Sequence, residues 1–255
     1  MQKFLIFFIT ALVVVIYSYS ASAEKNLYCG IEPSSYLAGS YNPEKLKCFV
    51  NPCELGIPCD DKKHYLREEA ASALKKMLSE FRKDHPGIKI TVRSSFRSFY
   101  DQKYIWNSKF DGTALVSGKN LSREFKNHQA RSREILKFSS MPGTSRHHWG
   151  TDFDINSLYN EYYNTGEGKI IYEWLKKNAG RFGFCQPYTE GRSGGYSEEK
   201  WHWSFKPLSE VFINDYNRLY EKDIKRFIKK SGFSGIDSSI NNALEYVNEI
   251  NGDCR

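Results

Sequence analysis

The sequence predicts an α+β fold built as a single domain. Several segments carry apolar residues at helical spacing, and only a few short stretches between them alternate like strands. These stretches do not form the regular strand–helix–strand alternation of a parallel α/β sheet. No unit recurs along the 255 residues either, which argues against a repeat architecture.

The first element along the chain is an export signal. Lys3 precedes an apolar run from Phe4 to about Tyr17, and small residues follow up to Ala23. The run is shorter than the roughly 20 residues that span a bilayer. We therefore expect residues 1–23 to be removed, which gives an exported protein, periplasmic or secreted, with no stable membrane insertion.

The mature chain is basic. The only charged residue in the signal is Lys3, so its removal lowers the formal net charge from +7 to +6. A positive charge attracts polyanions such as cell-wall polymers, anionic lipids or nucleic acid. The basic residues are spread among acidic ones, without a Lys/Arg block interleaved with aromatic residues. We expect a solvated basic surface, no nucleic-acid partner and a monomer.

Residues 24–60 are expected to form a disulfide-stapled segment rich in turns. An even number of cysteines in an exported chain predicts disulfides, although their pairing cannot be deduced from sequence. A structural zinc site is the alternative, and the absence of a C-x2-C pair disfavours it. The last two cysteines could tie the C-terminal tail to the body. The six are Cys29, Cys48, Cys53, Cys59, Cys185 and Cys254.

Residues 61–230 are expected to form the main domain. Its first helix has apolar residues recurring from Leu66 to Phe81 and stops at His85-Pro86-Gly87. The alternating residues Ile88, Ile90 and Val92 predict a half-buried strand next. Further helices are predicted at about 98–109, 121–138, 167–180 and 209–230, and short strands at Thr151–Ile155 and Trp201–Phe205.

Residues 231–255 are expected to form a C-terminal helix and tail. The pattern predicts a helix over about 237–250, and Asp237 or Ser238 would be its N-cap. Packing against the main domain is the expected role of this part.

Two short motifs carry histidine and carboxylate side chains in an order that suits a metal. The first is S-R-H-H-W-G-T-D-F-D at residues 145–154, and the second is E-K-W-H at residues 199–202. A catalytic zinc site typically combines three protein ligands of this kind with a carboxylate that acts as general base. The two motifs therefore predict a hydrolase.

The spacing within the motifs indicates which residues could share one metal ion. A strand after Gly150 would place Asp152 and Asp154 on one face. His147 lies on the turn before this strand and could fold back toward Asp154, helped by the backbone freedom of glycine. His202 would come from a separate strand and close the site.

These motifs resemble those of the zinc D-alanyl-D-alanine carboxypeptidases of the vancomycin-resistance type, within the M15 peptidases. The pattern S-x-H-x(6)-D falls on residues 145–154 and E-x-W-H on 199–202. Upstream, the S-x-[YF]-R-S segment with a nearby glutamine falls on Ser95, Phe96, Arg97, Ser98 and Gln102. The resemblance covers roughly residues 65–207. It implies a small central antiparallel sheet flanked by helices, as in the hedgehog and DD-peptidase folds.

The resemblance also implies a role for each motif residue and one catalytic zinc ion. A permanent guanidinium charge suits the stabilisation of an oxyanion, and a hydroxyl suits the binding of a terminal carboxylate. By resemblance, the metal ligands are His147, Asp154 and His202, the general base and acid is Glu199, the oxyanion is held by Arg97, and the substrate-binding residues are Ser145 and Gln102.

Some neighbouring residues leave alternatives open. Asp152 stands where many family members carry a small residue, so it could orient a histidine, bind the metal or face solvent, and we favour the first. His148 could replace His147 as ligand, although the spacing to the aspartate favours His147. Arg146 and Arg192 are further candidates to bind the substrate carboxylate.

The sequence thus predicts an exported zinc peptidase that hydrolyses the terminal D-Ala-D-Ala bond of peptidoglycan stem peptides. A peptidoglycan endopeptidase of the same fold and a non-catalytic zinc-containing binding module are the alternatives. A structural metal site needs neither a general base nor an oxyanion-binding cation, so Glu199 and Arg97 together favour an enzyme. Fold analogy alone does not decide between these functions.

Overall fold

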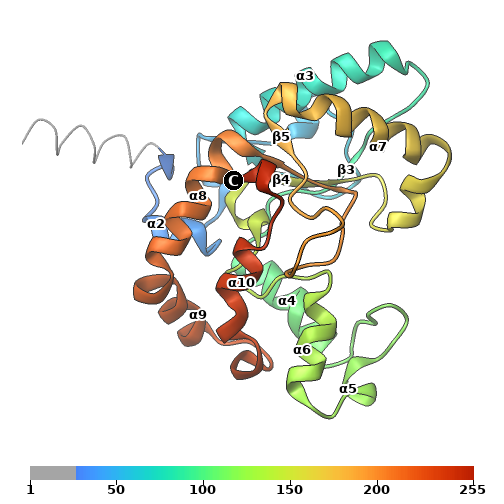
Figure 1. Ribbon diagram of the computed structural model, residues 1–255. Coiled ribbons are helices and arrows are strands. Elements are labelled where there is room, and N and C mark those ends of the chain that lie inside the picture. Colours follow the sequence, from blue (N-terminus) through green and yellow to red (C-terminus); the bar gives the residue numbers. More distant parts are fainter. Residues whose placement is uncertain (1–26) are drawn as a thin grey trace, which may run out of the picture.

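The computed structural model describes residues 27–255, so the predicted signal peptide lies outside the described residues. A four-stranded antiparallel sheet lies between two groups of helices (Figure 1). Helices α3 (Glu68–Asp84) and α7 (Gly166–Asn178) cover one face of the sheet. Helices α4 (Phe99–Phe110), α6 (His128–Leu136) and α10 (Ala243–Asn248) lie on the other side. This arrangement confirms the predicted α+β class.

The register of the sheet brings together the two motifs at residues 145–154 and 199–202. Asp154 lies directly opposite His202, and Asp152 opposite Ser204. Directly opposite side chains on one face of an antiparallel pair are close neighbours. The strands are, in order across the sheet, β3 (Val92–Ser94), β4 (Asp152–Ile155), β6 (His202–Phe205) and β5 (Phe184–Cys185).

Two hydrophobic cores lie on the two sides of the candidate site. The first packs α3 and α7 onto the sheet and contains Phe153 and Ile155, which confirms the predicted alternation along β4. The second joins the N-terminal segment to the helices on the other side and contains Trp149 and Trp106. The chain passes from one core to the other between Trp149 and Phe153, so the candidate ligands lie where the cores meet.

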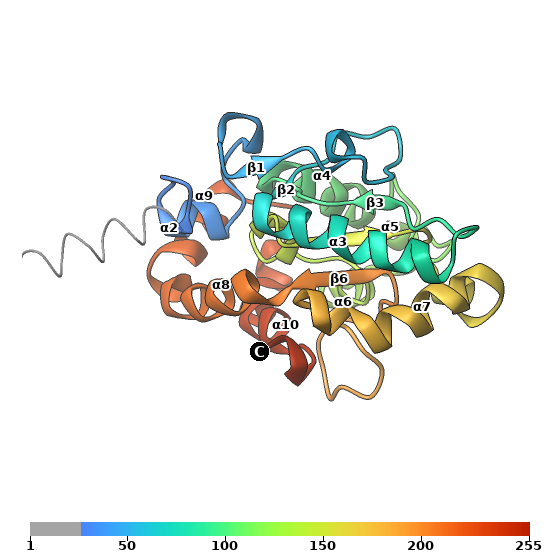
Figure 2. The ribbon, with the colours of Figure 1, turned by 90° about the horizontal axis from the view of Figure 1, so that it is seen from above.

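Three disulfides link the six cysteines: Cys29–Cys48, Cys53–Cys59 and Cys185–Cys254. The first two hold the N-terminal segment, and the third ties the tail to β5, as suggested from sequence. The N-terminal segment also contains α2 (Pro33–Leu37) and β1 (Phe49–Val50), which pairs with β2 (Leu66–Arg67) next to the start of α3 (Figure 2).

The remaining helices are shorter or interrupted. Helix α5 (Leu121–Glu124) precedes α6, and α8 (Lys206–Leu219) continues through a π-helical turn at Tyr220–Ile224 into α9 (Lys225–Ser231). Within residues 27–255, no helix is long and apolar enough to cross a membrane. Short 3-10 turns lie at Pro43–Lys45, Pro52–Leu55, Arg146–Trp149, Asn160–Asn164, Ala179–Phe182, Ile236–Ser238, Ile240–Asn242 and Gly252–Cys254.

Several predicted boundaries are wrong. Leu66 belongs to β2 rather than to the first helix, and the strand begins at Val92, after Ile88 and Ile90. The helix predicted over 121–138 is broken because the Asn127 side chain accepts from the Ala130 N–H and starts a new helix.

The C-terminal helix is also shorter than predicted. Asp237 and Ser238 lie in a 3-10 turn, and the α-helix begins only after Asn242, so neither predicted N-cap is correct. Helix α8 conversely starts three residues earlier than predicted, because Pro207 is tolerated in a first turn, where its missing N–H has no helical acceptor.

Candidate active site

His147, Asp154 and His202 meet at one buried point. His147 lies in the 3-10 turn that precedes β4, Asp154 on β4, and His202 opposite it on β6. One ligand atom from each lies within 4.8 Å of the others. The structure thus brings together the three residues predicted as ligands, and two imidazoles with one carboxylate form a donor set of the kind that zinc takes.

The orientation of His147 is set by a backbone carbonyl. Its Nδ1 atom lies 2.7 Å from the carbonyl oxygen of Ser95. That oxygen can only accept, so Nδ1 carries the proton and Nε2 keeps its lone pair. Nε2 lies 3.3 Å from Oδ2 of Asp154. The end of β3 therefore fixes the tautomer that a metal ligand requires.

His202 lies between two carboxylates. Its Nε2 is 2.9 Å from Oδ2 of Asp152, and its Nδ1 is 2.8 Å from Oδ1 of Asp154. Burial alone would lower the pKa of His202, but the two carboxylates outweigh it and raise this pKa to about 9. Nδ1 is the ring nitrogen that faces the cluster, and Asp152 holds the opposite side of the ring.

Asp152 is fully occupied by donors. Its Oδ1 accepts from the hydroxyls of Thr151 at 2.6 Å and Ser204 at 2.8 Å, and Oδ2 accepts from Nε of Arg146 at 2.9 Å. Burial would raise the pKa of Asp152, but Arg146 and His202 hold it well below its usual range. Of the three roles considered, orientation of a histidine fits these contacts.

Arg146 is therefore a structural partner of Asp152 rather than a substrate donor. Its guanidinium is buried and also lies 4.8 Å from the ring centre of Trp149. Arg192, the other candidate donor, bonds the backbone carbonyls of Thr189 and Glu249 and holds its own loop. Both side chains are thus engaged by protein groups, and Nη1 of Arg146 has no partner among the described residues.

Glu199 lies beside the cluster without joining it. Its Oε2 is 3.9 Å from Nδ1 of His202, and the residue is buried. Burial raises the pKa of Glu199 to about 8; His202 opposes this shift and Asp154 adds to it. A carboxyl group whose pKa lies near neutrality is suited to take and return a proton.

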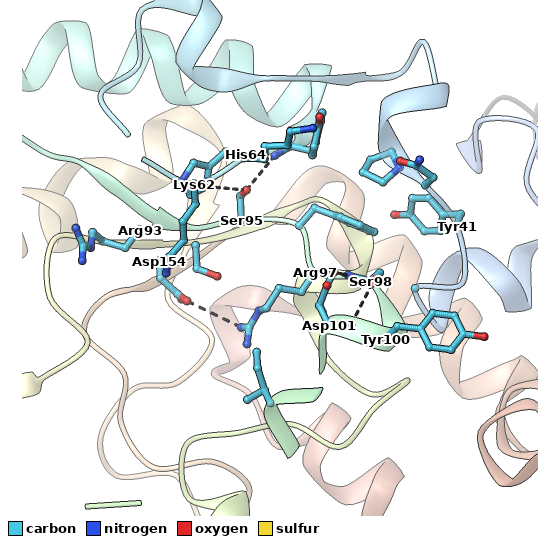
Figure 3. Close-up of a pocket in the computed structure, with 18 of the residues that line it drawn as sticks. Tyr41, Lys62, His64, Arg93, Ser95, Arg97, Ser98, Tyr100, Asp101 and Asp154 are labelled. Carbon is cyan, nitrogen blue, oxygen red and sulfur yellow. Dashed lines mark hydrogen bonds and ion pairs between the residues drawn. The ribbon is translucent and has the colours of Figure 1, made fainter. Parts of the chain in front are cut away.

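Arg97 approaches the cluster from the end of β3. Its Nη2 is 4.0 Å from Oδ2 of Asp154, and Figure 3 shows the side chain directed at that carboxylate. Its Nη1 donates to Oε1 of Gln102 at 3.1 Å. The amide nitrogen of Gln102 donates to the carbonyl of Ser140, and Gln102 is fully buried. Gln102 therefore positions Arg97, whereas the sequence suggested that it binds substrate.

Ser145 and His148 flank His147 and differ in what they contact. The Ser145 hydroxyl is buried and has no hydrogen-bond partner among the described residues. Both ring nitrogens of His148 are used, by the carbonyl of Arg97 at 2.7 Å and the N–H of Gly143 at 3.0 Å. His148 is thus outside the ligand cluster, and Ser145 keeps a free hydroxyl near it.

Two residues near the site were not identified from sequence. His64 is buried, with its ring between Oδ1 of Asp60 at 2.7 Å and the hydroxyl of Ser95 at 3.1 Å. Lys109 lies at the end of α4, half-buried, and donates to the hydroxyl of Ser139. Its place seven residues after Gln102, on the same helix face, was the signal that could have identified it.

A groove of about 840 Å³ leads to Arg97 and Asp154 (Figure 3). One wall comes from residues 39–43 of the N-terminal segment and another from Tyr100 and Ile105 of α4. Residues 93–98 also line it. The candidate site is therefore reached along a surface to which the disulfide-bonded segment contributes.

Comparison with known proteins supports the same assignment. The family model VanY, described as D-alanyl-D-alanine carboxypeptidase, matches residues 63–208. YodJ of Bacillus subtilis (strain 168), a carboxypeptidase by name, is 27% identical over 214 residues, which cover 81% of this chain and 69% of that protein.

Two further proteins are similar. The D-alanyl-D-alanine carboxypeptidase of Enterococcus faecalis (strain ATCC 700802 / V583) is 29% identical over 140 residues, which cover 54% of this chain but only 46% of that protein. The solved structure of the LdcB LD-carboxypeptidase shares the fold, with a TM-score of 0.50 and 24% identity over 76% of this chain and 91% of that chain. Since the family model spans more than half of the residues, the chain belongs to the VanY family of D-alanyl-D-alanine carboxypeptidases.

Proposed function

We propose that this protein is an exported, zinc-dependent D,D-carboxypeptidase that removes the terminal D-Ala from peptidoglycan stem peptides. The convergence of His147, Asp154 and His202 beside the buried Glu199 carries the proposal. Both rings are held through the nitrogen that faces away from the cluster, by a carbonyl and by a carboxylate. This arrangement fits zinc, whose histidine ligands are typically held in this way.

Zinc bound to these residues would supply a Lewis acid that polarises the carbonyl of the scissile bond. Glu199 would take a proton from the attacking water and return it to the departing amine. Arg97, fixed by Gln102, would stabilise the negative charge that develops on the carbonyl oxygen. We propose these roles for the residues, and the burial of the site strengthens each electrostatic interaction.

The substrate assignment rests on the family and on charge. A relative with 29% identity is named a D-alanyl-D-alanine carboxypeptidase, and LdcB is described in terms of peptidoglycan recognition. The positive formal net charge, +7 for the full sequence and +6 without Lys3, suits an anionic cell-wall polymer. We further propose residues 61–230 as the catalytic domain, with residues 39–43 of the N-terminal segment forming part of the groove wall.

A peptidoglycan endopeptidase is the second candidate. The groove beside Arg97 and Asp154 favours it, because 840 Å³ accommodates more than a dipeptide. An endopeptidase must accept peptide on both sides of the scissile bond, whereas a carboxypeptidase needs one side closed around a chain end.

Mass spectrometry of the purified mature protein with zinc would test these candidates. The substrates are a stem pentapeptide ending in D-Ala-D-Ala, the corresponding tetrapeptide, and cross-linked muropeptides. Loss of one alanine from the pentapeptide, abolished by a chelator, supports the proposal. Cleavage of the tetrapeptide alone indicates an L,D-carboxypeptidase, cleavage of cross-links alone indicates an endopeptidase, and no cleavage favours a binding module.

A further inference from the structure

One face of α4 continues past the residues already described. Gln102, Ile105 and Lys109 follow at spacings of three and four, so they lie on the same side of the helix. Gln102 bonds Arg97, and Ile105 lines the groove. Lys109 is thus the next side chain along a helix face that borders the candidate site.

The contacts of Lys109 tie it to the same network. Its ammonium group donates to the hydroxyl of Ser139, which is buried. The carbonyl of the next residue, Ser140, accepts from the amide of Gln102 at 2.7 Å. Arg97, Gln102, the 139–140 segment and Lys109 therefore form one connected wall.

The ammonium group of Lys109 has no carboxylate partner. Among residues 27–255, no Asp or Glu lies within ion-pair distance of it, and the contact with Ser139 is to a neutral hydroxyl. Burial, together with Arg97, lowers the pKa of Lys109, and Glu199 opposes the shift. A half-buried cation without an anion is costly unless a ligand supplies one.

Other buried donors also lack acceptors. Nε of Arg97, which belongs to this wall, is unpartnered among the described residues, as are the hydroxyl of Ser145, two residues before His147, and Nη1 of Arg146. Buried donors are almost always satisfied in native proteins, and an unsatisfied one carries an uncompensated desolvation cost. A cation without an ion-pair partner and an unpartnered guanidinium N–H, both in one connected wall, indicate a ligand that carries an anionic oxygen.

We propose that Lys109 binds the free α-carboxylate of the departing residue and so restricts the site to chain ends. This inference rests on the proposed function. A peptide that continues beyond the scissile bond presents a neutral amide at that place and leaves the ammonium group unpaired. Lys109 would therefore decide between carboxypeptidase and endopeptidase action, which the groove alone leaves undecided.

A matched pair of peptides tests the role of Lys109. One ends in D-Ala-D-Ala with a free carboxylate, and the other is identical but carries a C-terminal amide. Wild-type protein should prefer the acid in kcat/KM, and Lys109→Met should reduce this preference by about 10- to 100-fold, the range of a charge-assisted hydrogen bond. Lys109→Arg should keep part of the preference for the acid. A purely structural role would change both substrates equally.

Lys103→Met provides the control, because Lys103 lies on the same helix but donates to the carbonyl of Ser231, outside the site. The ratio of kcat/KM for the acid to kcat/KM for the amide should be the same in Lys103→Met as in the wild type.

Calorimetry measures the preference for the acid without hydrolysis, as the ratio of the affinities for D-Ala-D-Ala and for its amide. If no peptide is cleaved but Lys109→Met abolishes a preference for the acid in binding, the proposed function fails and the role of Lys109 stands. The role of Lys109 is overturned if Lys109→Met leaves the acid-to-amide ratio unchanged, or if the wild type shows no preference for the acid.

Discussion

Each histidine near the candidate site has its orientation set by the partners of its ring nitrogens. Ser95 offers a carbonyl to His147 and leaves its Nε2 atom for the cluster. Both ring nitrogens of His148 are hydrogen-bonded to backbone groups. His202 is held by Asp152 and turns Nδ1 toward the cluster. These hydrogen bonds thus decide whether a histidine leaves a nitrogen available to a metal ion.

Glu199 and His202 should separate catalysis from metal binding. Glu199→Gln should keep zinc and reduce hydrolysis of the pentapeptide by at least about 100-fold, because the amide cannot accept a proton from water. His202→Ala should lose both zinc and hydrolysis. Zinc content by mass spectrometry and the initial rate of alanine release measure the two effects. A fully active Glu199→Gln variant would remove Glu199 as the general base.

Asp152 should act on zinc through His202. In Asp152→Asn the carboxylate that orients the ring is gone, and we expect zinc affinity to fall by about 10- to 100-fold. Arg146 also loses its partner, so the free energy of unfolding should fall by about 3–5 kcal/mol.

Competition with a chromophoric chelator measures the affinity of Asp152→Asn, and urea unfolding measures its stability. Asp84→Asn is the control, because Asp84 bonds the indole N–H of Trp174 on the far side of the sheet. Equal zinc affinities in the two variants would contradict the proposed role of Asp152.

At the scale of elements, the turn before β4 is fixed by Gly150. Its φ is +71°, and an added Cβ would lie 2.3 Å from the ring of Phe49. Its carbonyl accepts from the N–H of Arg67 at 2.8 Å, so the turn cannot easily move away. The N-terminal segment can therefore approach the turn that carries His147 closely only because residue 150 is glycine and has no side chain.

Gly150→Ala should destabilise the protein more than Gly56→Ala. Gly56 has a similar φ of +80° but open space around it, so both variants carry the backbone penalty of about 1–2 kcal/mol. Gly150→Ala adds a steric cost of about 1–3 kcal/mol. Urea unfolding of both variants measures the difference, and equal values would show that Phe49 moves aside freely.

The elements differ in how far they were predictable from sequence. The amphipathic helix before His85 and the strands that carry Asp154 and His202 follow from periodicity, which is a local property. The break at Asn127 depends on one side chain that bonds the backbone in place of the helix. The 3-10 turns around Ile236 and Ile240 depend on packing against distant segments, which periodicity does not register.

The site shows the same division. The cluster of His147, Asp154 and His202 could be predicted because zinc chemistry favours these residue types and motif spacing fixes their order. The contacts of His64 and Gln102 could not, because they join residues that lie far apart in the sequence, whereas helical spacing from Gln102 offered a signal for Lys109. The choice between His147 and His148 was likewise decided by the backbone at residues 95–97.

At the scale of the whole molecule, the Cys185–Cys254 disulfide encloses β6 and α8 within one loop. The chain-entropy estimate for its sequence separation of 69 gives a stabilisation of roughly 4 kcal/mol, against roughly 2 kcal/mol for the separation of 6 in Cys53–Cys59. Replacing Cys185 and Cys254 by Ala should therefore lower the free energy of unfolding by more than the matching Cys53 and Cys59 double variant. Guanidinium unfolding measures both, and the reverse order would contradict the estimate.

The pairing pattern also bears on how the protein acquires its bonds. Each disulfide joins cysteines that are consecutive in the chain, so the three loops neither overlap nor nest. If the chain is exported as proposed, an oxidant that meets it while it emerges can form each native pair in order, with no later exchange. The Cys185–Cys254 loop, which contains His202, would close last, after the two disulfides of the N-terminal segment have formed.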